Sequence, residues 1–345
     1  MSNSLYQPGS SLQLQVLRGY CNLPFSQSIT AEISKTLDTT MSSVMEVIIK
    51  SEPNLRAVLK LYDRRYGTDL RDIPGQPAPH PADEAAFQSF VRLGKIGPFF
   101  EELEEEKKAE LIPLKAWQLY DGSQEGSAKY EAALWQECDE YFNCETEAYA
   151  RLKDLQGRSI PQMYAHVCFA LSDVPSDLLQ PQMERYFTVK GVLLELIPGY
   201  NLWDITTSPL APEPKKWLGI IQSAVDTVHD INKRGILMND CGPRNVMVHK
   251  HLQTPFIIDL AQCYFKDKII EAWKGTWESD EDEDEDEDAE DLNPDVEYWR
   301  RAMRSDNPGA IGAVMKTLLL EAKGIQLDVK YPDCNKIIND IKNDK

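Results

Sequence analysis

The stretch Gly235-Ile-Leu-Met-Asn-Asp-Cys-Gly-Pro-Arg-Asn-Val-Met-Val248, followed by Phe256-Ile-Ile-Asp-Leu260, is the most informative part of this 345-residue chain. It places Asp240 and Asn245 five residues apart, on a predicted loop between a helix and a strand, and Asp259 at the end of a second apolar strand. Phosphoryl transfer needs such a set, because one carboxylate orients the acceptor hydroxyl while an amide oxygen and another carboxylate bind Mg²⁺ on the nucleotide phosphates. The stretch therefore predicts phosphoryl-transfer chemistry.

The same spacing resembles the catalytic loop and the metal-binding strand of the protein kinase-like superfamily. The triplet at 238–240 reads Met-Asn-Asp where protein kinases have H-R-D, and the triplet at 259–261 reads Asp-Leu-Ala where they have D-F-G. Choline kinase-like enzymes have H-N-D, so Asn239 favours the small-molecule branch. The segment 243–246 is similar to kinase-like proteins of fungal type.

The resemblance implies a role for each residue of the loop. Asp240 and Arg244 would be catalytic, and Arg244 occupies a position at which tyrosine kinases also carry Arg. Asn245 and Asp259 would bind Mg²⁺, and ATP would be the phosphoryl donor.

The resemblance also implies a two-lobed α+β protein kinase-like fold, with an antiparallel N-lobe sheet plus one helix and a mainly helical C-lobe. Residues 1–27 show no clear periodicity and are predicted to be an N-terminal extension. The N-lobe would span 28–197, with an insertion at about 67–136, and the C-lobe would span 198–345 with a disordered acidic loop at about 278–292.

Three strand-like runs are expected early in the chain, at Ile29–Ile33, Val44–Ile49 and Ala57–Leu61. The third resembles the kinase strand that carries the phosphate-binding lysine, which implies that Lys60 contacts the α- and β-phosphates of ATP. Between the first two runs, residues 37–43 contain no glycine, although glycines let backbone amides approach phosphates closely.

Residues 144–155 predict a helix that resembles the kinase helix whose glutamate pairs with the phosphate lysine. Glu145 fits that position, and Glu147 is the competitor. Both would be ordinary surface charges if the resemblance does not hold. A longer amphipathic helix is predicted at Trp217–Lys233, directly before the informative stretch.

Two further strands are expected at Tyr186–Val189 and at 191–199, before a Pro-Gly turn. The second resembles the kinase strand that enters the interlobe hinge. By that resemblance Leu194 would be the gatekeeper, and the backbone of Glu195 and of Ile197 would meet the adenine edge.

The composition limits the partners. Residues 278–291 supply twelve carboxylates, which leaves −7 of the net charge of −19 to the remaining chain. This block is expected to be a solvated loop, or a docking segment for a basic protein partner. Nucleic-acid binding is disfavoured because no basic stripe offsets the acidity.

No apolar run is long enough for a membrane span. Seven scattered cysteines favour reduced thiols, and the sequence therefore predicts a cytoplasmic or nuclear protein.

Three interpretations stay open. The first is an ATP- and Mg²⁺-dependent phosphotransferase with an unidentified hydroxyl-bearing substrate. The second is a pseudokinase, a nucleotide-binding or scaffold module, which the glycine-free segment and the altered triplets favour. The third is an unrelated α/β protein in which the motif occurs by chance.

Overall fold

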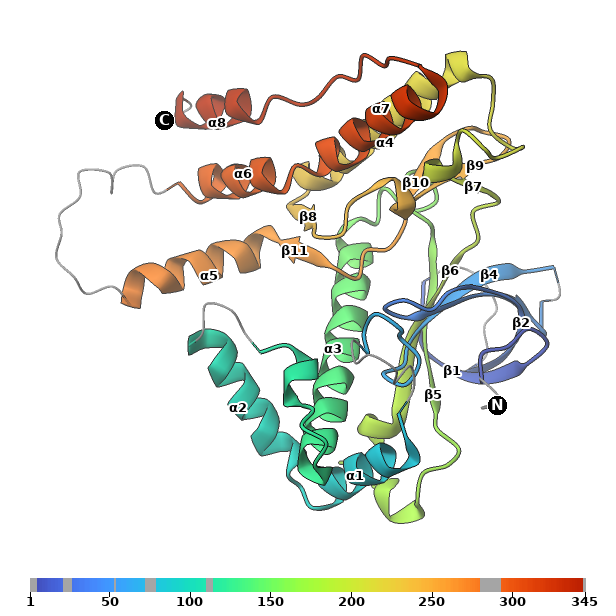
Figure 1. Ribbon diagram of the computed structural model, residues 1–345, viewed down its shortest axis with the longest axis vertical. Helices are drawn as coiled ribbons and strands as arrows, with labels where there is room; N and C mark the ends of the chain where they lie inside the picture. The colour runs from blue at the N-terminus through green and yellow to red at the C-terminus, as the bar shows by residue number, and fades with distance from the viewer. Residues whose placement is uncertain are drawn as a thin grey trace. The chain divides into compact units, whose positions relative to one another are not determined.

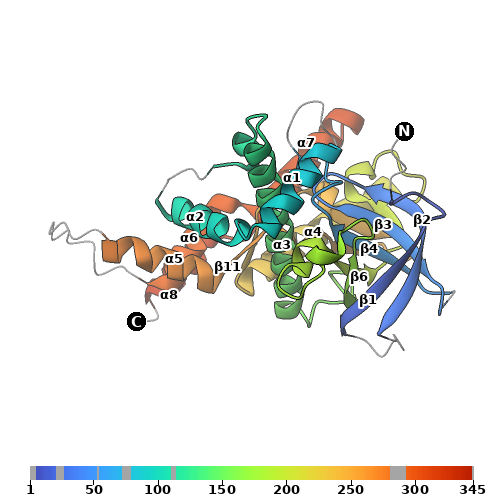
Figure 2. The ribbon, with the colours of Figure 1, turned by 90° about the horizontal axis from the view of Figure 1, so that it is seen from below.

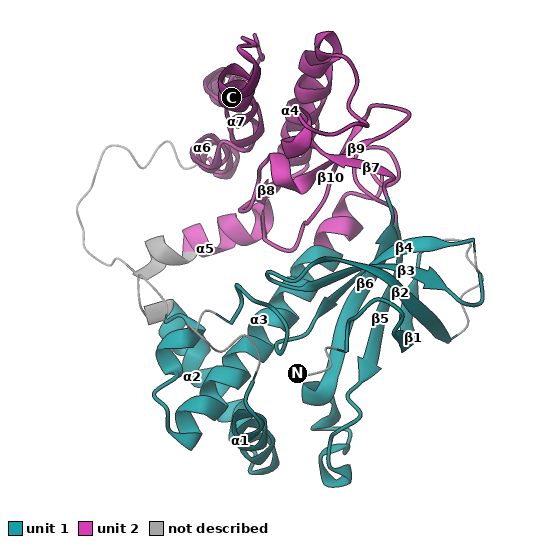
Figure 3. Ribbon diagram, turned by 45° about the vertical axis from the view of Figure 1, so that its right-hand side comes forward, with its two compact units in different colours: residues 1–146, 163–196 teal, residues 147–162, 197–345 magenta. Residues whose placement is uncertain are grey.

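The computed structural model describes residues 5–20, 27–52, 54–71, 79–109, 114–279 and 293–343. The acidic segment predicted as a disordered loop at 278–292 lies almost wholly outside these residues. The chain divides into two compact units, coloured separately in Figure 3. Unit 1 comprises Met1–Thr146 and Met163–Leu196, and unit 2 comprises Glu147–Gln162 and Ile197–Lys345.

Unit 1 is built on a closed antiparallel barrel with the strand order β1-β2-β3-β4-β6-β5 (Figures 1 and 2). The strands are β1 (Ser11–Gly19), β2 (Ser28–Asp38), β3 (Ser43–Ile49), β4 (Arg56–Tyr62), β5 (Met163–Ala170) and β6 (Thr188–Glu195). The expectation of a two-lobed protein kinase-like fold with an N-lobe sheet is therefore wrong, because the sheet closes on itself.

Strand β1 is what closes the barrel. Leu14 faces Ile29 of β2, and the next residue, Gln15, faces Cys168 of β5, so β1 joins the two ends of the sheet. Leu12 and Leu14 are buried while their neighbours are exposed, as expected for a strand with one face on a core. The prediction that residues 1–27 form an irregular extension is wrong for this segment.

The three early strand predictions are confirmed by β2, β3 and β4. The two later ones merge into the single strand β6, which runs through Gly191. A Cβ at this glycine would lie 2.5 Å from the carbonyl oxygen of Lys60, so only glycine permits the close approach of β6 to β4.

Three helices belong wholly or mainly to unit 1: α1 (Pro81–Arg92), α2 (Ile96–Ala109) and α3 (Gln124–Arg151). The helix predicted from residue 144 begins much earlier, and α3 belongs to unit 1 up to Thr146. It contacts α2 through Phe100 and Trp135, whose rings stack with centroids 5.7 Å apart. Figure 2 shows α1 and α2 beside α3.

Unit 2 combines short sheets with longer helices. Its strands are β7 (Gly199–Asn201), β8 (Ile236–Met238), β9 (Val246–His249), β10 (Pro255–Ile257) and β11 (Cys263–Phe265), paired in the orders β10-β9-β7 and β11-β8. Its helices are α4 (Trp217–Lys233), α5 (Lys266–Ser279), α6 (Pro294–Ser305), α7 (Asn307–Lys323) and α8 (Cys334–Asn343). Helix α4 confirms the amphipathic prediction, and it lies along α7 in Figure 1.

Candidate functional site

In unit 1, Lys60 and Glu145 form a buried ion pair. Lys60 lies in β4 and Glu145 in α3, and the Lys60 Nζ donates to Glu145 Oε1 at 3.4 Å. Their side chains are 6% and 0% exposed. Removal of either partner would take an ion-pair contact away from a buried charge, which is destabilising, so the two side chains depend on each other.

Tyr62 is a third member of this buried cluster, and it was not among the residues predicted from the sequence. Its hydroxyl donates to Glu145 Oε2, and its ring lies 5.5 Å from the Lys60 ammonium. Tyr62 stands two residues after Lys60 on the same strand, and side chains at this spacing point to the same face. That spacing is the signal that could have identified it.

Glu147 has other partners, all within unit 2. Its carboxylate accepts from Arg151 Nη2 at 2.5 Å and from Lys268 Nζ at 2.6 Å. The structure therefore places Glu145, and not Glu147, against Lys60.

The turn between β2 and β3 has a carboxylate of its own. Asp38 Oδ1 accepts from the backbone N–H groups of Thr39 and Thr40 at 2.7 and 3.2 Å. The Thr40 hydroxyl also donates to Asp38 Oδ2 at 2.9 Å. These backbone groups are thus already bonded to an anion at the position where the sequence lacks glycine.

The residues predicted to meet adenine fall in both units. In β6, Leu194 is buried between Val58 of β4 and Met163 of β5, and Glu195 pairs with Ala57 at the end of the strand. Ile197 is buried and is the first residue of the second segment of unit 2.

In unit 2, Asp240 and Asn245 are hydrogen-bonded across the loop that follows β8. The Asn245 Nδ2 donates to the Asp240 carbonyl oxygen at 2.8 Å and to Asp240 Oδ2 at 3.2 Å. Asp240 is exposed and Asn245 half-buried, while Met238, at the start of the loop, is buried. The loop therefore presents its carboxylate to solvent from a buried strand.

Asp259 lies beside Asn245 through the β9–β10 pairing. Ile257 faces Val246, and the Ile258 N–H donates to the Asn245 carbonyl oxygen at 2.9 Å. Asp259 itself has a φ of 61°, in the left-handed region that few residues other than glycine adopt. Asp adopts this region more readily than most side chains, as Asp306 also does with a φ of 41°, and strained positions of this kind cluster at functional sites.

Arg244 is exposed and does not join these carboxylates through any contact seen among the described residues. Its guanidinium lies 5.3 Å from the ring centroid of Trp203. Its carbonyl oxygen accepts from Asn201 Nδ2 at 2.5 Å. The structure thus gives the Arg244 side chain a cation–π contact, and its backbone carbonyl a hydrogen bond.

A buried amide network supports the loop, and none of its residues was predicted from the sequence. Asn307, at the start of α7, accepts from the Met238 N–H at 3.0 Å and donates to the Met238 carbonyl at 2.7 Å. With its Nδ2 oriented toward its acceptors, Asn232 of α4 donates to Asn307 Oδ1 at 2.9 Å. Both asparagines are at most 2% exposed.

Cys241 bonds to the same network. Its Sγ donates to the Asn307 carbonyl oxygen at 3.4 Å. Burial, followed by the negative charge of Asp240, raises the pKa of the Cys241 thiol to about 12. The thiol is therefore neutral near pH 7 and acts as a hydrogen-bond donor, not as a nucleophile.

The donor atoms in unit 2 fit Mg²⁺ bound together with a nucleotide. Within the described ranges, no group of three or more His, Cys, Asp and Glu side chains could hold a metal ion by itself. Asn245 commits its amide nitrogen to Asp240, so its amide oxygen is the atom that could face a cation. Asp259 supplies a carboxylate, whose Oδ1 also accepts from the Ala261 N–H at 3.4 Å. Mg²⁺ is commonly bound by one or two carboxylates plus phosphate oxygens and water, so this set suffices only with phosphate present.

Comparison of the chain with protein-family models and with curated protein sequences finds no match. In the part of the chain that the structure describes, none of the helices has the length and apolar character that crossing a membrane requires.

Proposed function

We propose that the chain is an ATP- and Mg²⁺-dependent phosphotransferase that transfers the γ-phosphoryl group of ATP to a hydroxyl acceptor. The observation that carries the proposal is the arrangement in unit 2, where Asp240 and Asn245 are hydrogen-bonded and Asp259 follows the residue bonded to Asn245. The resemblance of these motifs to those of the protein kinase-like superfamily supports the proposal, which does not extend to the two-lobed fold of that superfamily.

Asp240 is assigned to the acceptor hydroxyl. Its carboxylate is exposed, and the Asn245 amide holds one of its oxygens from the side. A carboxylate fixed in this way orients the attacking hydroxyl and accepts its proton. The new O–P bond forms as the bond between the γ-phosphorus and the bridging oxygen breaks, and ADP leaves. The Asn307 network keeps the backbone of the loop in place while this happens.

Asn245 and Asp259 are assigned to the metal ion. Bound to them and to the nucleotide, Mg²⁺ would neutralise the negative charge that builds up on the phosphates. The contribution of the chain is to fix both oxygen donors on adjacent backbone segments. Fixed donors are effective because they need no reorganisation during the reaction.

In unit 1, Lys60 is assigned to the α- and β-phosphates. The ammonium is held by Glu145 and by the ring of Tyr62, so its position is set before any ligand binds. A cation held in one place binds phosphate with a smaller loss of side-chain entropy.

A second candidate is a nucleotide-binding or scaffold module without turnover. The observation that favours it is the turn after β2, where Asp38 occupies the N–H groups of Thr39 and Thr40. Those amides would otherwise be available to a phosphate. A phosphate near this turn would have to displace or approach the Asp38 carboxylate, and like charges repel.

Thermal unfolding with ATP, with and without Mg²⁺, tests both candidates, together with a measurement of phosphate transfer or release. A ligand at a hundred times its Kd adds about 2.7 kcal/mol of stability. For the phosphotransferase we expect a Mg²⁺-dependent rise in Tm and Mg²⁺-dependent turnover, both lost in Asp259→Ala. The matched control is Asp173→Ala, at an exposed carboxylate of unit 1, which should behave as wild type.

The outcomes separate the candidates. A rise in Tm without turnover under any condition supports the binding module. Wild-type turnover in Asp259→Ala contradicts the metal assignment. The absence of any nucleotide effect contradicts both the phosphotransferase and the nucleotide-binding module, and leaves a scaffold that binds no nucleotide.

A further inference from the structure

Helix α3 carries a second buried glutamate on the face that bears Glu145. Glu131 precedes Glu145 by fourteen residues, close to four helical turns, so the two point the same way. The residues between them at helical spacing, Leu134, Cys138 and Phe142, are also buried. This stripe is therefore a continuous contact face that ends in a carboxylate on either side.

Glu131 is held by two arginines from the segment that follows β4. Arg71 forms a bidentate ion pair with Glu131. Its Nη2 donates to Oε1 at 2.6 Å and its Nη1 donates to Oε2 at 3.1 Å. Arg64 Nη1 donates to Oε2 as well. The side chains of all three residues are at most 4% exposed.

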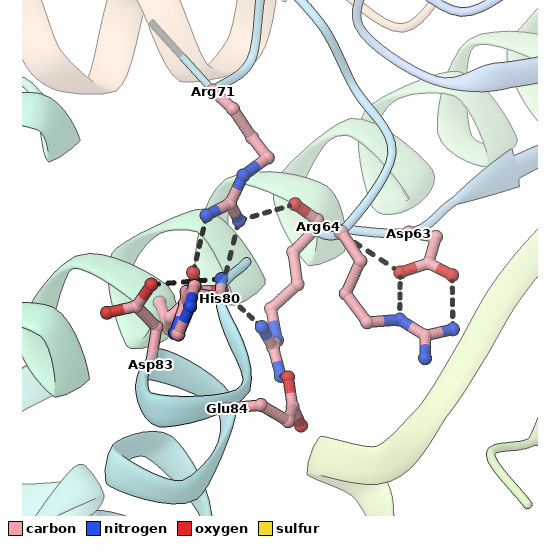
Figure 4. Close-up of polar contacts among 8 residues, drawn as sticks. Asp63, Arg64, Arg71, His80, Asp83 and Glu84 are labelled. Carbon is pink, nitrogen blue, oxygen red and sulfur yellow. Dashed lines mark hydrogen bonds and ion pairs between the residues drawn. The ribbon is translucent and has the colours of Figure 1, made fainter. Parts of the chain in front are cut away.

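The two arginines are also linked to each other and to α1. Arg71 Nη1 donates to the Arg64 carbonyl oxygen at 3.1 Å, and Arg64 Nη2 donates to Glu84 of α1 at 2.7 Å. Figure 4 shows Arg71 pointing toward the Arg64 backbone while the Arg64 side chain runs on to Glu84. The arginine segment is thus fixed independently of α3.

The strand and the helix are therefore joined at two separated points. Lys60, Tyr62 and Arg64 alternate along β4 and its continuation, and each bonds to a glutamate of α3. Glu131 and Glu145 lie about 21 Å apart along the helix axis. A slip of α3 by one turn, about 5.4 Å, would break the contacts at both points and separate buried charges from these partners.

We propose that Arg64, Arg71 and Glu131 are positioning residues that hold α3 in the register at which Glu145 meets Lys60. Their consequence for catalysis rests on the proposed phosphotransferase function, whereas their effect on Lys60 does not. Loss of the Glu131 carboxylate loosens the distant end of the contact face, and the Lys60–Glu145 pair then opens more often.

The test is the rate at which an amine-directed acetylating reagent modifies Lys60, measured by peptide mass spectrometry in wild type and in Glu131→Gln. The exposed Lys35 in the barrel serves as the internal reference. Charged hydrogen bonds of this kind are strong enough that we expect Lys60 labelling to rise about tenfold relative to Lys35. Any Mg²⁺- and ATP-dependent turnover should fall by a similar factor, mainly in kcat.

Glu84→Gln is the matched control, because it makes the same chemical change at the other partner of Arg64 but on α1. It should raise Lys60 labelling much less than Glu131→Gln does, even where it lowers Tm, because Arg64 and Arg71 still hold Glu131. If Glu131→Gln does not fold, Arg71→Met combined with Glu131→Gln removes one cation together with one anion and should give the same rise in labelling.

Equal labelling of Lys60 in wild type and in the folded Glu131 variants would overturn the inference, as would an equal rise in Glu84→Gln. If the wild-type protein shows no turnover but Lys60 labelling rises in the Glu131 variants alone, the phosphotransferase proposal is refuted and the positioning role stands.

Discussion

Replacement of Asn307 by alanine should destabilise unit 2 by an amount that the geometry allows us to work out. Asn307 satisfies both the N–H and the C=O of Met238, at 3.0 and 2.7 Å, in a position where it is 1% exposed. Alanine leaves both backbone groups buried without those partners, at about 1–3 kcal/mol each. The Asn232 amide loses one acceptor but keeps the carbonyl oxygens of Val228 and Ile236. We therefore expect the free energy of unfolding to decrease by about 3 kcal/mol, mainly from the two Met238 groups.

Two readouts measure this loss. Urea unfolding followed by circular dichroism gives the global change. Because the chain has two units, it need not unfold in one step, so amide hydrogen exchange at Met238 gives the local free energy of opening directly.

The control is Asn239→Ala, at an exposed asparagine next to Met238, whose side chain has a distant contact with Gln262 at 3.4 Å. This variant should change stability by less than about 0.5 kcal/mol. If Asn307→Ala loses no more than the control, and exchange at Met238 stays slow, the amide network does not hold the loop.

Three further outcomes are expected. Burial raises the pKa of Glu137 from its usual 4.5 to about 7. The folded state therefore favours the protonated carboxyl, and this contribution to stability is present below about pH 4.5 and is lost as the pH rises through about 7. Glu137→Gln should raise the free energy of unfolding at pH 8 by about 3 kcal/mol and flatten its pH dependence, measured by urea unfolding. Gly199→Ala should destabilise the protein by at least about 2 kcal/mol in the same assay, because a Cβ there overlaps the backbone carbonyl of Val248. Tyr298→Phe removes the buried hydrogen bond to the Asn232 carbonyl, 2.5 Å long, and should lower the free energy of unfolding by about 1 kcal/mol.

The parts of the fold that depend on nearby residues could be predicted. The periodic apolar residues of Trp217–Lys233 indicated α4, and the glycine that follows, Gly235, adopts a φ of +80° at its end. The alternating runs likewise indicated β2, β3 and β4. Each of these signals lies within a dozen or so residues, where backbone periodicity dominates.

Closure of the barrel could not be predicted in the same way, because it depends on pairing between Gln15 and Cys168, which are far apart in sequence. The alternation of Leu12, Leu14 and Val16 did carry a local strand signal, and the surrounding polar residues obscured it. The merging of two predicted strands into β6 has a similar cause, since Gly191 reads as a break in the sequence but serves the close packing of β4 against β6.

The residues of the candidate site likewise fall into those with a local sequence signal and those whose role depends on a residue distant in sequence. Asp240, Asn245 and Asp259 were found from a short motif, and Lys60 from a single strand. Tyr62 and Asn307 were missed because each acts through a residue distant in sequence, Glu145 in one case and Met238 in the other.

The role of β1 as the closing strand has a practical consequence for handling this protein. A version that begins at Ser28 would leave β2 and β5 with bare backbone edges and would uncover the core on which Leu12 and Leu14 pack. Exposed strand edges pair readily with other chains. Such a truncated protein should self-associate during expression, whereas a tag placed ahead of the intact first strand should leave the protein in solution.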